Sequence, residues 1–120
     1  MEHEADAELG RSFDRALEEG EAGQLRELVR RIVQDAEDAR FAEICCVRLA
    51  RHRNALVRGD ALAGFGRLAQ RFGRLDRRRV QRLVEKGLHA HHEYVRAQAA
   101  SAADDLETHL AWRLDRPGHA

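Results

Sequence analysis

One stretch of sequence and its second copy decide the fold. Residues 54–69 read NALVRGDALAGFGRLA, and residues 92–107 read HEYVRAQAASAADDLE. Val57-Arg58, Ala61 and Leu68 of the first stretch recur 38 residues later as Val95-Arg96, Ala99 and Leu106. A period of this length is typical of helical-hairpin repeats, in which a helix pair buries its apolar face only by stacking on its neighbours. We therefore expect an all-α fold.

Apolar residues recur at helical spacing along almost the whole chain. These stripes predict six helices, which cover residues 9–17, 25–33, 41–49, 57–72, 80–88 and 95–110. Connections of only a few residues predict that consecutive helices pack as antiparallel neighbours. We expect residues 1–120 to form a single domain, with residues 1–8 frayed and residues 113–120 a C-terminal tail.

Several polar residues and glycines suit helix ends. Asn54 and Asp76 are candidate N-caps for the fourth and fifth predicted helices, and Gly73 is a candidate C-cap for the fourth. The acidic residues Asp35, Glu37 and Asp38 suit the N-terminal end of the third helix, where their negative charges would interact favourably with the helix dipole.

Three glycines fall inside the fourth predicted helix, at Gly59, Gly64 and Gly66. A glycine in a helix interior costs roughly 1 kcal/mol relative to alanine. We expect these positions to let a neighbouring helix approach closely, which would offset that cost.

The charges balance overall but are unevenly distributed. The chain has 21 basic and 21 acidic residues, which gives no strong attraction to nucleic acid or to a membrane. Residues 1–43 carry 13 acidic and 6 basic residues, whereas residues 44–90 carry 12 basic and 3 acidic residues. This middle segment is either a set of solvated helix faces or a basic surface that docks an acidic partner.

The basic segment supplies the candidate protein-binding residues. They are all arginines, whose guanidinium groups suit bidentate contacts with carboxylates. The set is Arg48, Arg51, Arg53, Arg67, Arg71, Arg74, Arg77, Arg78, Arg79 and Arg82. If these side chains form one continuous patch, an acidic ligand would relieve their mutual repulsion.

Arg58 and Arg96 occupy equivalent positions in the repeat. We expect a structural role, in which each arginine pairs with a carboxylate or with a carbonyl at a helix C-terminus. Asp60, Asp104 and Asp105 are the candidate carboxylates. Binding of a phosphate or substrate is the alternative role.

The repeat residues resemble a known family. Residues 54–69 look like the first helix of a HEAT-like repeat of the bacterial lyase-associated type, and residues 38–112 are similar to a group of small bacterial HEAT-domain proteins. The shared elements are Asn54, Val57-Arg58-Gly59, Gly64-Phe65-Gly66, Leu75-Asp76 and Ala103-Asp104-Asp105-Leu106. Residues 1–37 match nothing in that group.

The resemblance implies a HEAT-like α-solenoid, a right-handed superhelix of about six antiparallel helices. Members of this group are often suspected to be immunity proteins of polymorphic toxin systems. It therefore implies a protein-binding module, in its most specific form one that occludes the active site of a cognate toxin. We expect the partner to be another protein and the protein not to be an enzyme. The alternatives are an enzyme on a HEAT scaffold, either metal-dependent or nucleic-acid-processing, and a structural subunit whose exposed solenoid ends self-associate into a homo-oligomer.

The densest set of candidate metal ligands is His89, His91 and His92 with Glu93. His92-Glu93 resembles one of the His-Glu pairs with which hydroxylases of the deoxyhypusine class hold two irons. The equivalent positions in the first copy, Asn54-Ala55, lack both ligands. We therefore expect no metal and no cofactor.

The cysteines suggest core residues rather than a nucleophile. Cys45 falls on the apolar stripe of its helix, and Cys46 lies to the side. No secretory signal and no long apolar run is visible in the sequence, so we expect a cytoplasmic protein with reduced thiols.

Overall fold

The computed structural model of the protein describes residues 4–118. Within this range the chain forms six α-helices and no β-strand. The helices are α1 (Glu4–Glu19), α2 (Ala22–Asp35), α3 (Ala39–Leu49), α4 (Ala55–Phe72), α5 (Arg77–Leu88) and α6 (Glu93–Leu110). The prediction of an all-α fold with six helices is confirmed.

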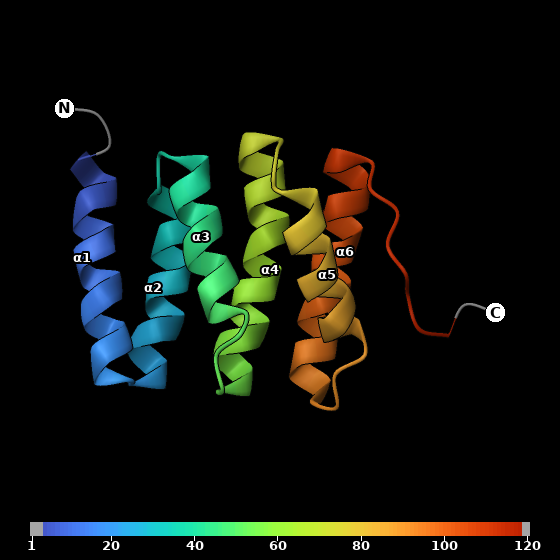
Figure 1. The fold of residues 1–120 in the computed structure, drawn as a ribbon, viewed down its shortest axis with the longest axis horizontal. Helices are drawn as coiled ribbons and strands as arrows, with labels where there is room; N and C mark the ends of the chain where they lie inside the picture. The colour runs from blue at the N-terminus through green and yellow to red at the C-terminus, as the bar shows by residue number, and fades with distance from the viewer. Residues whose placement is uncertain (1–3, 119–120) are drawn as a thin grey trace.

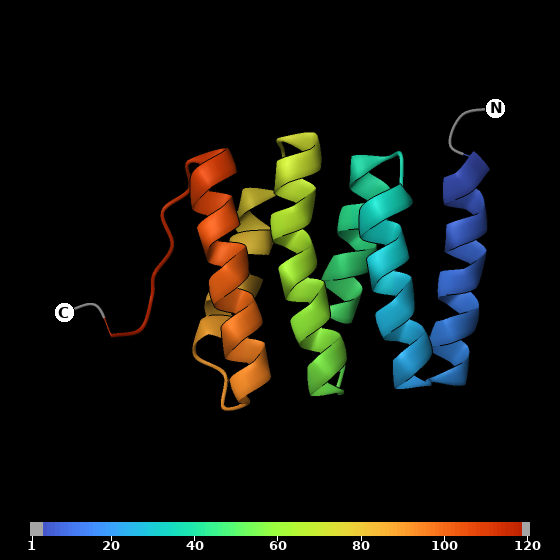
Figure 2. The same cartoon turned by 180° about the vertical axis from the view of Figure 1, so that it is seen from behind.

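The helices form two layers (Figures 1 and 2). The helices α2, α4 and α6 run in the same direction, side by side, and α1 continues this row at one end. The helices α3 and α5 lie in the second layer and, like α1, run in the opposite direction. Consecutive helices are therefore antiparallel, as their short connections predict. The molecule measures 49 × 29 × 18 Å, and its shortest dimension is the thickness of the two layers.

The predicted caps begin and end the helices. The Oδ1 atom of Asn54 accepts hydrogen bonds from the backbone N–H groups of Leu56 and Val57, at 2.9 and 3.1 Å, which fixes the start of α4. Asp76 caps α5 in the same way, and Gly73 ends α4 with a φ of 70°. These three predictions are confirmed. Among the acidic residues expected to start α3, Asp38 is its N-cap, whereas Asp35 is the last residue of α2.

The expectation that residues 1–8 are frayed is wrong for residues 4–8, which belong to α1. The cause is Asp6, which is buried although the surrounding sequence is polar. Its two carboxylate oxygens accept hydrogen bonds from the backbone N–H groups of Glu37 and Asp38, both at 2.8 Å. These bonds tie α1 to the connection between α2 and α3. Residues 1–3 lie outside the described residues.

The helix glycines allow close packing, as expected. The most extensive contact between helices is that of α4 with α6. A Cβ atom at Gly59 would lie only 2.7 Å from the ring of Tyr94 in α6, and one at Gly66 would lie 2.9 Å from the Cβ atom of Asp105. A larger residue at either position would require the facing side chain or the helix that carries it to shift.

The C-terminal segment packs back onto the last hairpin. Ala111 ends α6 with a φ of 58°, and the side chains of Trp112 and Leu114 are buried. The backbone of the segment bonds to α5: Gln81 Nε2 donates to the carbonyl of Arg113, and the N–H of Asp115 donates to Glu85 Oε2. Arg116 then pairs with Asp104 and Glu107 of α6. The described tail, residues 111–118, is irregular but attached. The last two residues of the predicted 113–120 tail lie outside the described residues.

Candidate functional site

The two repeat arginines make the same contacts in both copies. The Nη1 atom of Arg58 donates to the carbonyls of His52 and Arg53, at 3.2 and 3.0 Å. The Nη1 atom of Arg96 donates to the carbonyls of Ala90 and His91, at 2.9 and 2.7 Å, which are the positions 38 residues later. Each arginine therefore ties the start of its helix to the loop before it. A structural role was expected, but the acceptors are loop carbonyls and not carbonyls at the C-terminus of a helix.

The expected carboxylate partners of these arginines are wrong. Asp60 bonds instead to Arg26 and Tyr94, because it projects toward α2 and α6 while Arg58 turns back to the loop. Asp104 pairs with Arg116 of the tail. Asp105 packs against Gly66 at the contact between α4 and α6.

The ten candidate arginines do not form one continuous patch. Arg51 and Arg53 lie in the loop before α4, whereas Arg74 and the arginines that begin α5 follow its other end. Since α4 has 18 residues, its two ends are about 27 Å apart. Arg67 lies within α4 and faces a cleft against α2. All ten members are exposed, but the single surface predicted from their sequence order is wrong.

Two members of the set have structural contacts. Arg71 donates to the carbonyls of Val33 and Ala36 at the C-terminal end of α2, both at 2.7 Å, and its guanidinium lies 4.5 Å from the ring centre of Phe72. Arg77 bonds to Gln81, and its guanidinium lies 5.8 Å from the ring centre of Trp112. Both arginines join neighbouring elements and are therefore poor candidates for partner binding.

The histidine cluster serves helix ends. His92 is the N-cap of α6: its Nδ1 atom accepts from the backbone N–H of Tyr94 at 3.1 Å, and His89 follows the last residue of α5. His52 accepts from the backbone N–H of Asn54 in the first copy, and burial lowers its pKa. Within residues 4–118, no group of three or more histidines, cysteines, aspartates and glutamates is placed to hold a metal ion.

Both cysteines are core residues. The prediction placed Cys46 to the side of the helix, but it is 1% exposed and Cys45 is 3% exposed, because α3 is covered on more than one face. Burial raises the pKa of Cys45 to about 12 and also raises that of Cys46. Neither thiol is disulfide-bonded. Thiols with such pKa values stay protonated at neutral pH and are weak nucleophiles.

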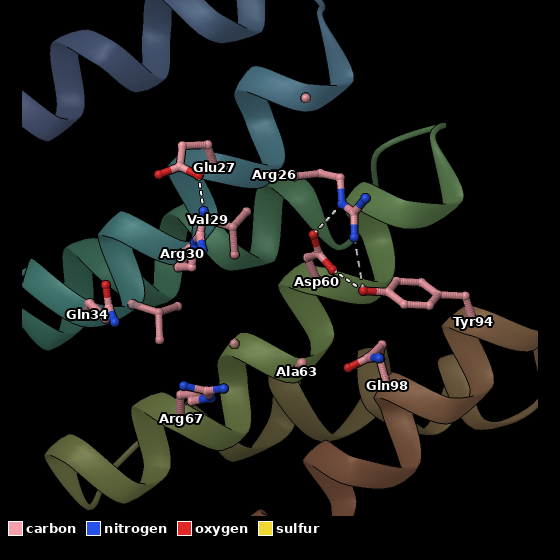
Figure 3. Close-up of a pocket in the computed structure, with 13 residues that line it drawn as sticks. Arg26, Glu27, Val29, Arg30, Gln34, Asp60, Ala63, Arg67, Tyr94 and Gln98 are labelled. Carbon is pink, nitrogen blue, oxygen red and sulfur yellow. Dashed lines mark hydrogen bonds and ion pairs between the residues drawn. The ribbon is translucent and has the colours of Figure 1, made fainter.

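The structure brings together a cleft that the sequence analysis did not predict (Figure 3). It has a volume of about 570 Å³ and lies between α2, α4 and α6. Its apolar residues are Val29, Val33, Ala63 and Gly64. Arg30 and Gln34 of α2 lie on one side of the open space, and Arg67 of α4 and Gln98 of α6 lie on the other.

A hydrogen-bonded network closes one end of the cleft. We call Arg26, Asp60 and Tyr94, which come from α2, α4 and α6, the three-helix network. Arg26 Nε donates to Asp60 Oδ2 at 2.7 Å and Arg26 Nη2 donates to the Tyr94 hydroxyl at 3.3 Å, while that hydroxyl donates to Asp60 Oδ1. The bond to Asp60 raises the pKa of Arg26, and burial with the same carboxylate raises the pKa of Tyr94. Arg26 therefore stays charged and the Tyr94 hydroxyl stays protonated throughout the neutral range.

The three arginines of the cleft differ in what they already bind. Arg26 is held by the three-helix network, and Arg30 pairs with Glu27 at the surface. Arg67 is exposed and makes no hydrogen bond, ion pair or ring contact with any other residue of the range 4–118. Among these three side chains, Arg67 is the one whose donors face only solvent.

Comparison with known proteins adds no family: no protein-family model, no curated protein and no solved structure matches the chain. None of the helices described between residues 4 and 118 is both long and apolar enough to cross a lipid bilayer. A functional assignment therefore has to come from the residues of this chain.

Proposed function

We propose that this protein is a protein-binding module built from HEAT-like helical repeats, which stack as a short right-handed α-solenoid. The repeat of 38 residues supports this, because its two copies become α4 and α6, which have the same direction and the same loop contacts through Arg58 and Arg96. Stacked helical hairpins offer extended faces that many repeat proteins use to bind partners.

The observation that carries the proposal is the cleft on the α2–α4–α6 face. Its rim holds polar side chains from three helices, and the three-helix network fixes those helices relative to one another. A surface that is already ordered before binding loses little conformational entropy when a partner docks. This arrangement suits recognition of a macromolecule more directly than catalysis, since most of the exposed polar groups at the rim are guanidinium and amide groups.

Toxin immunity is the most specific form of this proposal, and it rests on the family resemblance. In that form the mechanism is occlusion of a toxin's active site, with complementary charges that speed association. Two surfaces of opposite charge could serve. One is the outer face of α1, where the exposed Glu4, Glu8, Asp14 and Glu18 outnumber the exposed Arg11 and Arg15, and the other is the arginine-bearing cleft. A cytoplasmic location belongs to the same proposal.

The test is co-purification of the tagged protein from its native cells, at low and then at moderate salt, with analysis of bound metal and nucleic acid in the same sample. A single protein retained near stoichiometry supports the binding module, and its release by salt indicates a charged interface. Stoichiometric iron or zinc, or bound nucleic acid with no retained protein, would instead support an enzyme on this scaffold.

A further inference from the structure

We propose that the cleft between α2, α4 and α6 binds one carboxylate side chain from an acidic segment of a partner protein, with Arg67 as the main anion-binding residue. This inference rests on the proposed protein-binding function and specifies the chemistry of its contact.

Arg67 supplies the free donors. Its guanidinium is exposed and has no partner among the described residues, unlike those of Arg26 and Arg30 in the same cleft. A guanidinium offers two parallel N–H groups whose spacing matches the two oxygens of a carboxylate. The amides of Gln34 and Gln98, which also line the cleft, can donate further hydrogen bonds to an anion.

The apolar part of the cleft favours a peptide as the source of that carboxylate. Val29, Val33 and Ala63 lie beside the polar rim, and Gly64 lets α4 pack closely against Val33 at the floor of the cleft. A volume of about 570 Å³ exceeds what a single carboxylate needs. The remaining space can take the methylene groups of a glutamate and an apolar neighbour in the same segment.

The charges of the cleft match one anionic group and not a nucleic-acid backbone. Glu27 and Asp60 line the same cleft as the three arginines, so the site carries a small net positive charge. A strand with a phosphate at every nucleotide would meet these carboxylates, and repulsion would weaken its binding.

The experiment titrates the intact, isotope-labelled chain with the peptide acetyl-ALEELA-amide and follows it by NMR. The expected shifts fall on the backbone amides of Ala63 and Gly64 and on the Nε–H of Arg67. The matched peptide acetyl-ALQQLA-amide tests for charge. We expect it to bind about fivefold more weakly, which is the upper end of what one exposed ion pair contributes.

Arg67→Gln is the informative variant, because Arg67 has no contact to lose within the described residues and folding should be unaffected. It should weaken binding of the acidic peptide about fivefold. Arg82→Gln is the control: it removes the same charge from an exposed position on α5, in the other helix layer, and should leave binding unchanged.

Four results would overturn the inference. They are no binding of the acidic peptide, equal binding of the glutamine peptide, equal loss in Arg67→Gln and Arg82→Gln, and preferential binding of a single-stranded oligonucleotide at the same residues. The proposed protein-binding function is tested separately. If the Arg67→Gln variant retains a native partner as well as the wild type does, the protein-binding function stands and the cleft is not the contact surface.

Discussion

At the residue scale, Gly59 decides how closely α4 and α6 approach. A Cβ atom there would lie 2.7 Å from two ring carbons of Tyr94, and the ring cannot move away without loss of its hydrogen bond to Asp60. Gly59→Ala should gain about 1 kcal/mol of helix propensity. It should also cost about 1–3 kcal/mol of overpacking. We expect a net loss of stability of about 1 kcal/mol, measured by urea unfolding followed by circular dichroism.

Gly10→Ala is the matched control for that substitution. Gly10 also lies inside a helix, but a Cβ atom there would lie 3.6 Å from Phe41, which is ordinary van der Waals contact. The variant should therefore keep most of the propensity gain and be more stable by up to about 1 kcal/mol. If the Gly59→Ala variant is as stable as the wild type, α4 and α6 can adjust to the added methyl group without a loss of stability, and the prediction is wrong.

Two buried thiols make stability depend on alkaline pH. Burial raises the pKa of Cys45 from 9.0 to about 12, so in the folded state the thiol stays protonated while in the unfolded chain it ionises. The unfolded state then binds fewer protons, and the free energy of unfolding falls as pH rises between about 9 and 12. We expect a decrease of up to about 1.4 kcal/mol per pH unit for each thiol. Below pH 8 the thiols should contribute no such slope.

Urea unfolding at a series of pH values from 8 upward checks this dependence. The double variant Cys45→Ala/Cys46→Ala provides the comparison. It should be less stable at every pH because it leaves cavities, but its alkaline slope should be clearly smaller. The same slope in the variant and the wild type would assign the alkaline loss to other groups.

At the scale of the helix, the N-cap of α4 can be tested against its counterpart in the second repeat. Asn54→Ala removes the acceptor for the N–H groups of Leu56 and Val57 and should cost about 1 kcal/mol. Asn54→Asp keeps the acceptor and should be nearly neutral. His92 caps α6 at the equivalent position through Nδ1, so Asn54→His should lose less than Asn54→Ala. Equal losses in all three variants, measured by chemical unfolding, would mean that packing alone fixes this helix start.

The helices were predictable because their signals are local. The apolar stripes and the caps at Asn54 and Asp76 each lie within one helix or one loop, and the structure confirms these helices and both caps. The burial of Asp6 was not predictable, because its partners, the backbone N–H groups of Glu37 and Asp38, lie 31 and 32 residues away.

The cleft was missed for the same reason. The three-helix network joins Arg26 to Asp60 and Asp60 to Tyr94. The two residues of each pair are 34 positions apart and have no shared pattern in the sequence. Arg67 is one exposed arginine among many, and only the three-dimensional structure separates it from Arg71, which is occupied by the carbonyls of α2. The repeat did contain one usable signal. In the first copy, Gly59 and Asp60 follow the repeated Val57-Arg58 pair. The second copy has Ala97 and Gln98 at these positions, so only the first copy has an acidic residue next to a glycine there.

At the scale of the whole molecule, the two ends of the proposed helical array determine whether copies of the chain associate. Repeat arrays need end units with a polar outer face, because an uncovered helix pair exposes apolar surface. Here α1 presents exposed charged residues at one end. At the other, the tail places Trp112 and Leu114 in the core beside α5 and α6, and Arg116 fastens it to Asp104 and Glu107. Both described ends are therefore covered.

We accordingly expect the chain to be a monomer at micromolar concentration in sedimentation equilibrium, which separates it from the self-associating alternative. Trp112→Ala/Leu114→Ala should release the tail and expose the apolar side of the last hairpin. The variant should then melt at a lower temperature and gain weight-average mass as its concentration rises. Arg113→Ala, which changes an exposed neighbour in the same segment, should do neither. A wild-type dimer that persists at low concentration would mean that another face of the two layers is the interface, and the α2–α4–α6 face would be the first to examine by cross-linking.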